Sequence, residues 1–182
     1  MVSRLLRYLG GWFVWNDPKD DIPDPATGLT PKHIRSIREN WDLVKINFKQ
    51  NGLDFFIKFF GDHPYTQDFF EQLKGQSLDT LATSPKLRAH AMTVMYSLTS
   101  LVDSLDDPEC LVGLARKISA NHLRNGIQMK EFDVLGRVLV EFLREKLGSA
   151  FTEFHKEAWI TLYTNFCSVV DDEMEQLKAA KK

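Results

Sequence analysis

The sequence has few of the residues that build disulfide-rich, membrane-spanning or nucleic-acid-binding proteins. It has only two cysteines, Cys110 and Cys167, in 182 residues. Two widely separated cysteines do not form a disulfide framework, so we expect reduced thiols in an intracellular protein. The formal net charge of −2 gives no basic footprint for nucleic acid, and no apolar run is long enough to span a bilayer. The 13 phenylalanines, by contrast, are a high count that suits a cavity lined by planar rings.

The chain also lacks the alternating pattern, bounded by hairpin turns, that is typical of strands. Residues 16–30, NDPKDDIPDPATGLT, are rich in Asp and Pro and predict a linker after an N-terminal segment. A helical period then continues almost to the end of the chain. The sequence therefore predicts an all-α domain of seven or eight helices.

Capping residues, prolines and glycines predict where these helices begin and end. The first helix is expected from Thr30-Pro31 to Asn51-Gly52, a second ends near His63-Pro64, and a short helix from Pro64 to about Phe70 is followed by a polar corner through Gly75. The next two helices are expected from Ser84-Pro85 to about Ser104 and from Asp107-Pro108 to Asn125-Gly126. A further helix ends at Gly148, and the last one starts near Ser149.

Two of the five histidines lie on or beside apolar helix faces. His33 and His155 fall in first turns of predicted helices and His63 at a helix end, so we interpret these three as surface or capping residues. His90 and His122 follow the inward stripes of consecutive predicted helices. A core histidine satisfied by a carbonyl is the ordinary explanation for one such residue. Two on helices that could face each other make that explanation weaker.

A zinc site and a nucleophilic Cys–His pair are the alternatives. Zinc needs three or four ligands that are often close in sequence, and no His or Cys lies within a turn of His90 or His122. Cys110 precedes His122 by about three helical turns, which is too far for local pairing. The sequence gives little support to either alternative.

The region from about Leu29 to Leu177 resembles the globins in the order and spacing of its motifs. LTPKHIRSIRENW is similar to the first globin helix with its Trp, and FFIKFFGDHPYTQDFF to the second and third helices with the Pro between them. The His of LRAHAMTVM matches the distal histidine. The His of ISANHLRNGI matches the proximal histidine, and the Gly-Ile after it occurs in several tissue globins.

This resemblance implies a globin fold around a haem b pocket, with His122 as the proximal iron ligand and His90 on the distal side. A haem iron takes an axial imidazole, and an apolar wall keeps water from oxidising the iron. Phe56 falls where globins carry a residue overhanging the distal pocket. The residues expected to line the pocket are Phe56, Phe70, His90, Val94, Ile118, His122, Ile127, Phe132 and Leu135.

Two roles are open for His90. Its N–H could donate to bound O2, a hydrogen bond worth about 1.5–3 kcal/mol, or about ten- to a hundredfold in affinity. Alternatively, His90 could ligate the iron itself, as the distal histidine does in many neuronal and tissue globins. The segment between the two histidines looks longer than in muscle-type globins, which favours bis-histidyl, hexacoordinate iron when no gas is bound.

Residues 1–28 depart from the storage-type globin pattern, so we expect an N-terminal extension and linker before a globin domain at 29–178. The cations, aliphatic residues and tryptophans of residues 1–15 suit a peripheral membrane contact. A disordered arm and an arm docked on the globin surface are the alternatives. Val2 excludes N-myristoylation, and Arg7 with Gly10-Gly11 interrupts any secretory apolar run. We expect a cytoplasmic protein.

The predicted function is reversible binding of O2 and other diatomic gases, for oxygen storage, transport or supply in tissue. A cellular reductase is the expected redox partner, and a monomer or a homodimer the expected state. The alternatives are a haem redox enzyme, with nitric oxide dioxygenase, nitrite reductase or peroxidase-like activity, and a sensor acting through the N-terminal arm. Turnover needs an electron source, and no reductase domain is fused to this chain.

Overall fold

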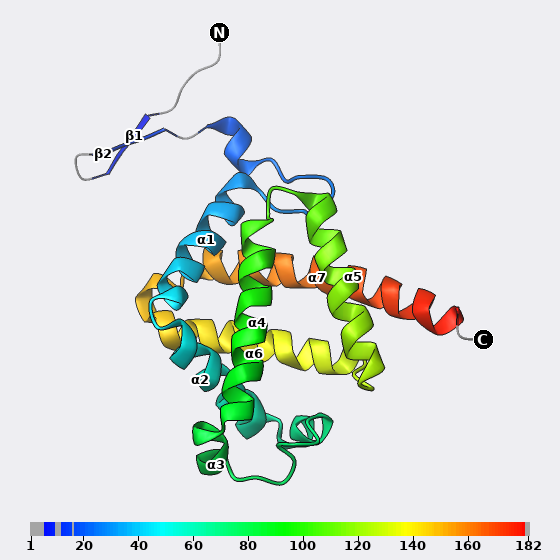
Figure 1. Ribbon diagram of the computed structural model, residues 1–182. Helices are drawn as coiled ribbons and strands as arrows, with labels where there is room; N and C mark the ends of the chain where they lie inside the picture. The colour runs from blue at the N-terminus through cyan, green and yellow to red at the C-terminus, as the bar shows by residue number, and fades with distance from the viewer. Residues whose placement is uncertain (1–5, 10–11, 16, 181–182) are drawn as a thin grey trace.

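Figure 1 shows the computed structural model, which describes the backbone of residues 6–9, 12–15 and 17–180 and the side chains of 17–180. Two strands and a 3-10 helix come first: β1 (Leu6–Leu9), β2 (Trp12–Trp15) and η1 (Pro18–Asp21). The helices that follow are α1 (Pro31–Lys45), α2 (Phe48–Asp62), η2 (Pro64–Phe69), α3 (Leu78–Thr83), α4 (Pro85–Asp103), α5 (Pro108–Arg124), α6 (Met129–Leu147), η3 (Gly148–Ala150) and α7 (Glu153–Ala179). The all-α class is confirmed.

Most of the predicted helix boundaries lie where the sequence places them, because local capping chemistry fixes them. Thr30, Ser84 and Asp107 each accept a hydrogen bond from a backbone N–H in the first turn of the helix they precede. Gly126 and Gly148 follow α5 and α6 with φ of +80° and +52°, a conformation that glycine adopts without a steric penalty.

The predicted helix end at Asn51-Gly52 is wrong, because both residues lie inside α2. The break comes earlier, between Lys45 and Phe48. The Asn51 side chain donates to the Val44 carbonyl at 2.8 Å, which ties the start of α2 to the last turn of α1. Gly52 is a contact position instead: a Cβ there would lie 2.7 Å from Cγ of Met95, so the glycine allows α2 and α4 to approach closely.

Three other features differ from the expectation. The short helix α3 lies between the polar corner and α4, and α7 begins at Glu153, four residues beyond Ser149. The N-terminal extension contains strands, paired antiparallel with Leu6 opposite Trp15 and Leu9 opposite Trp12. Two four-residue runs rich in bulky residues, separated by two glycines in the sequence, are a hairpin pattern. The side chains of residues 1–16 lie outside the described residues, so the membrane contact of residues 1–15 stays a prediction.

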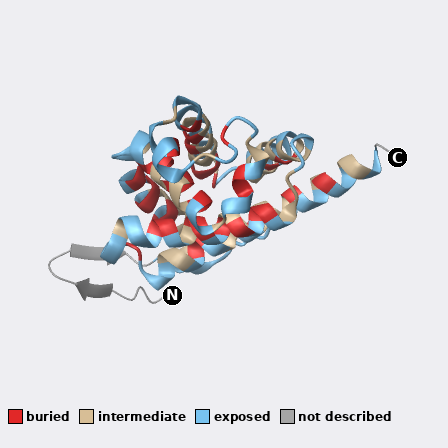
Figure 2. Cartoon of the chain, turned by 90° about the horizontal axis from the view of Figure 1, so that it is seen from below, coloured by how far each residue is buried: buried red, intermediate tan, exposed pale blue. Residues whose placement is uncertain are grey.

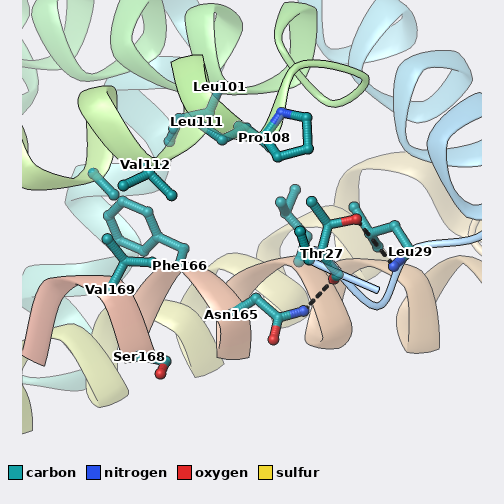
Figure 3. A pocket seen from close by; sticks show the side chains of 13 residues that line it. Thr27, Leu29, Leu101, Pro108, Leu111, Val112, Asn165, Phe166, Ser168 and Val169 are labelled. Carbon is teal, nitrogen blue, oxygen red and sulfur yellow. Dashed lines mark hydrogen bonds between the residues drawn. The ribbon is translucent and has the colours of Figure 1, made fainter. Parts of the chain in front are cut away.

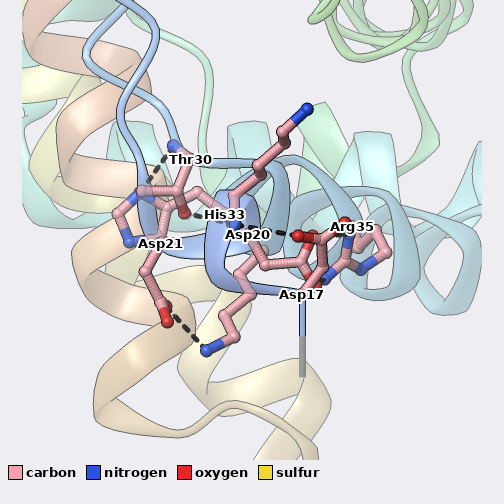
Figure 4. A network of polar contacts seen from close by, with 8 residues as sticks. Asp17, Asp20, Asp21, Thr30, His33 and Arg35 are labelled. Carbon is pink, nitrogen blue, oxygen red and sulfur yellow. Dashed lines mark hydrogen bonds and ion pairs between the residues drawn. The ribbon is translucent and has the colours of Figure 1, made fainter. Parts of the chain in front are cut away.

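The linker is fastened to the start of α1 by charged side chains (Figure 4). Arg35 donates to both carboxylate oxygens of Asp20, at 3.0 and 2.8 Å, and Lys32 lies 2.6 Å from Asp21. The hydrogen bond from Arg35 lowers the pKa of Asp20. His33 accepts from the Thr30 backbone N–H and so caps α1, as predicted. The linker therefore has a defined path over the helical domain.

The helices enclose two separate groups of buried apolar side chains. In Figure 1, α4 and α5 run across the direction of α6 and α7, and in Figure 2 buried positions (red) alternate with exposed ones (pale blue) along the helices. The larger cluster joins α1, α2, α4, α6 and the start of α7, where Trp41 packs on Trp159 with ring centroids 5.9 Å apart. The smaller cluster joins α5, α6 and the second half of α7. Within the described part of the chain, no helix has the length and apolar character needed to cross a membrane.

Candidate functional site

His122 lies near the end of α5 with its ring held in one orientation. Its Nδ1 lies 2.8 Å from the carbonyl oxygen of Ile118, one helical turn back. A carbonyl only accepts hydrogen bonds, so Nδ1 carries the proton and Nε2 keeps a lone pair. A hydrogen bond of this kind at the other ring nitrogen fixes the orientation of an imidazole that ligates a metal.

The wall beside His122 is built by α6 and α7. The ring of Phe132 lies 5.1 Å from the His122 ring, and Tyr163 donates from its hydroxyl to the Phe132 carbonyl at 2.7 Å. Burial raises the pKa of Tyr163, so this phenol keeps its proton and remains a donor. Gly136 leaves room for the Tyr163 ring, since a Cβ at this position would lie 2.2 Å from Cε1 of Tyr163.

His90 lies in the first half of α4 against two aromatic rings. The rings of Phe56 and Phe70 each have their centroid 4.9 Å from that of His90, in edge-to-face geometry. No hydrogen bond joins the His90 ring to another residue in the part of the chain that the structure describes. Burial, and to a smaller extent the charge of a protonated His122, lowers the pKa of His90 to about 4. The ring is therefore neutral near pH 7, with one N–H and one lone pair.

The predicted pocket residues fall into two groups, one with each histidine. Phe56, Phe70, Val94 and Leu135 belong to or pack on the larger cluster, with His90. Ile118, Ile127 and Phe132 belong to or pack on the smaller cluster, with His122. Most of these apolar side chains are only half-buried. Ordinary core residues of these types are usually fully buried. Since α6 contributes Phe132 to one group and Leu135 to the other, it borders both.

Several residues of the site were missed by the sequence analysis. Tyr163 and Gly136 fix the backbone of Phe132, and Leu123 and Met129 pack beside it. A glycine inside a strongly periodic helix signals a close approach, so Gly136 could have been found. No sequence signal connects Tyr163 to a residue 31 positions earlier.

The alternative chemistries have no support in the geometry. Among the described residues, no three His, Cys, Asp or Glu side chains lie together as metal ligands. The Cys110 thiol contacts the Ser104 hydroxyl at 3.4 Å rather than His122, and burial raises the pKa of Cys167 to about 12. The residues do fit a haem, which brings four nitrogens of its own and needs from the protein an axial imidazole nitrogen within an apolar enclosure.

The structure thus combines an all-α fold with two imidazoles, each packed against aromatic side chains, and these are features that a haem pocket requires. Comparison with known proteins agrees: the family model described as Globin matches residues 53–170. The chain is 34% identical over 139 residues to a globin of Buccinum undatum, covering 75% of this chain and 94% of that protein. It is 27% identical over 154 residues to a globin of Nerita albicilla, covering 85% and 98%. The chain belongs to the globin family.

A solved structure shares the fold. The crystal structure of a hexacoordinated haem protein from an anhydrobiotic tardigrade, at pH 4, superposes with a TM-score of 0.77 and 21% sequence identity, covering 84% of this chain and 99% of that one. The predicted globin fold is thus confirmed. Globins bind haem and, through it, O2 and other gases, so family membership supports haem binding by this chain.

Proposed function

We propose that this globin binds O2 and other diatomic gases reversibly at haem b, for oxygen storage, transport or supply within tissue. The observation that carries the proposal is the 2.8 Å contact between Nδ1 of His122 and the Ile118 carbonyl oxygen, which requires the proton to be on Nδ1. With the proton on Nδ1, Nε2 keeps its lone pair and is free to bind iron as an axial ligand. The bound haem would supply the iron position at which a gas is held.

The residues of the chain would hold the haem iron and line the two sides of the pocket. His122 holds the iron on the proximal side, and Ile118, Ile127 and Phe132 form the apolar wall beside it, while Leu135 on α6 continues this wall into the larger cluster. On the distal side, Phe56, Phe70 and Val94 exclude water, because apolar surface at a site disfavours solvent there. The aromatic rings around His90 also limit the room available to a gas molecule.

His90 has both of the groups that its two roles require. A neutral imidazole offers an N–H that donates to the oxygen of a diatomic ligand, and a lone pair that ligates iron when no gas is present. We propose that it does both, with the hexacoordinate, bis-histidyl state prevailing in the gas-free ferrous protein. The absorption spectrum of that protein tests this: sharp, well-split visible bands indicate six-coordinate low-spin iron, and one broad band would contradict it.

We further propose that residues 29–178 hold the haem and residues 1–28 form a separate extension. The protein works in the cytoplasm, as a monomer or homodimer, with a cellular reductase that returns oxidised iron to the ferrous state. Residues 1–15 contact a membrane surface peripherally. Sedimentation of the full chain with vesicles containing anionic lipid tests the last point, with residues 17–182 as the control.

Autoxidation separates storage from turnover. Slow autoxidation with moderate O2 affinity supports the proposed function. Fast autoxidation with rapid re-reduction by a cellular reductase would instead favour a haem redox enzyme, such as a nitric oxide dioxygenase. The measurement uses the purified full chain loaded with haem b, followed in air by its visible spectrum.

A further inference from the structure

We propose that a cavity outside the histidine site, where the linker crosses α5 and α7, binds a small apolar organic molecule about the size of a benzene ring. The cavity has a volume of about 170 Å³ and shares none of the nine predicted pocket residues. Figure 3 shows side chains from three parts of the chain around it. Its apolar lining comes mainly from Leu29, Leu101, Leu111, Val112, Phe166 and Val169.

The linker forms one wall of this partly open cavity in a fixed conformation. The Asn165 side chain on α7 donates to the backbone carbonyl of Thr27, as drawn in Figure 3. Asp24 accepts hydrogen bonds from the backbone N–H groups of Ala26 and Thr27, both at 2.9 Å. Gly28, with φ of +63°, makes the turn that brings Leu29 inside. This wall is therefore held in place by hydrogen bonds, and its exposed Ala26 lies at the rim of the cavity.

The polar atoms near the cavity are already engaged or directed elsewhere. The Thr27 hydroxyl donates to Asp24 and accepts from the Leu29 N–H. The Asn165 amide nitrogen donates to the Thr27 carbonyl, the Asn165 oxygen points away from Leu111 and Val112, and so does the Ser168 side chain in Figure 3. An enclosed, engineered cavity of about 150 Å³ lined by Leu, Ile and Phe accepts benzene or xenon, and the lining here is of the same apolar kind. The chemistry here thus favours an uncharged apolar ligand over water or an anion.

The cavity adjoins the smaller apolar cluster that also contacts His122. Phe166 lines the cavity, and its ring centroid lies 6.1 Å from that of Phe132, which in turn packs against His122. Ala115 on α5 is buried and belongs to both the cavity lining and the cluster. An occupant would therefore contact side chains that support the proximal wall.

Benzene is the probe that tests the proposal, titrated into the full-length, haem-loaded ferrous protein saturated with carbon monoxide and followed by NMR. We expect saturable binding in the wild type. The variant Val112→Phe fills the cavity and should weaken binding at least tenfold. The matched control Val140→Phe makes the same change on α6, at a half-buried position that does not line the cavity, and should bind as the wild type does.

A second variant protects the test against a folding failure of Val112→Phe. Ala26→Phe places a ring at the exposed rim, away from the core, and should also weaken binding at least tenfold. Absence of benzene binding in the wild type, or unchanged binding in both variants, overturns the proposal; unchanged binding would assign benzene to another site. The haem spectrum of the same samples reports the proposed gas-binding function separately.

Discussion

His122 and His90 differ in what holds them. A hydrogen bond to the Ile118 carbonyl fixes the tautomer of His122, and Tyr163 fixes the backbone of its neighbour Phe132. His90 is held by packing alone against Phe56 and Phe70. A hydrogen bond to a carbonyl engages one ring nitrogen of His122, whereas edge-to-face packing leaves both ring nitrogens of His90 without a hydrogen-bond partner among the described residues. The comparison agrees with the proposed roles, which are one for the ring of His122 and two for the ring of His90.

The largest effect in this comparison should follow His122→Ala. Without the imidazole, no other described side chain offers a fixed axial nitrogen on that side. Purified protein should be colourless or lose its haem rapidly, as measured by haem transfer to an excess of another haem acceptor. Added imidazole should partly restore the colour. His63→Ala, at the C-cap of α2, is the matched control and should retain haem; a tightly pigmented His122→Ala protein with normal gas uptake would refute the proximal assignment.

The next largest effect should come from His90→Leu, which removes both distal functions while keeping the site apolar. We expect about ten- to a hundredfold faster O2 dissociation, because the hydrogen bond to the ligand is lost. The gas-free ferrous spectrum should change from six- to five-coordinate. Stopped-flow O2 release and the visible spectrum measure the two changes. A six-coordinate spectrum that survives the substitution would mean that another group is the sixth ligand.

Gly136→Ala should disturb the proximal wall by crowding. Its Cβ would lie within 2.9 Å of three Tyr163 ring atoms, so the helices or the ring must move, at a cost of about 1–3 kcal/mol in the free energy of unfolding. Gly113→Ala in α5 is the control, since no atom lies within 4 Å of its added Cβ. That control should raise the free energy of unfolding by about 0.5–1 kcal/mol. Urea denaturation measures both; equal effects of the two variants would contradict the crowding.

Tyr163→Phe should have the smallest effect. It removes the hydroxyl that donates to the Phe132 carbonyl, which is worth about 0.5–1.5 kcal/mol of unfolding free energy. Haem dissociation should quicken slightly, while the distal properties, including O2 release, stay unchanged. Tyr96→Phe removes an exposed hydroxyl on α4 and serves as the control. Faster O2 release in Tyr163→Phe would show that the two sides are not independent.

Local chemistry explains which parts of this fold were predictable. Thr30, Ser84 and Asp107 cap their helices through contacts within three residues, so sequence alone identifies them. Asn51 and Gly52 form an ordinary helix-ending pair, yet in the structure they serve contacts with α1 and α4. The prediction there was wrong because a distant helix, and not a neighbouring residue, decides their role.

The sequence by itself determined the helical class, the positions of the two imidazoles on apolar helix faces and the resemblance to globins that implies a haem pocket. These depend on residue type and short spacing. Only the tertiary structure decided the aromatic enclosure of His90, the tie between Tyr163 and Phe132, and the linker that lies along a second cavity. Each of these joins side chains to groups whose positions depend on how the backbone folds and how whole helices pack against one another. Packing is set by the sum of many weak contacts, which no short stretch of sequence contains.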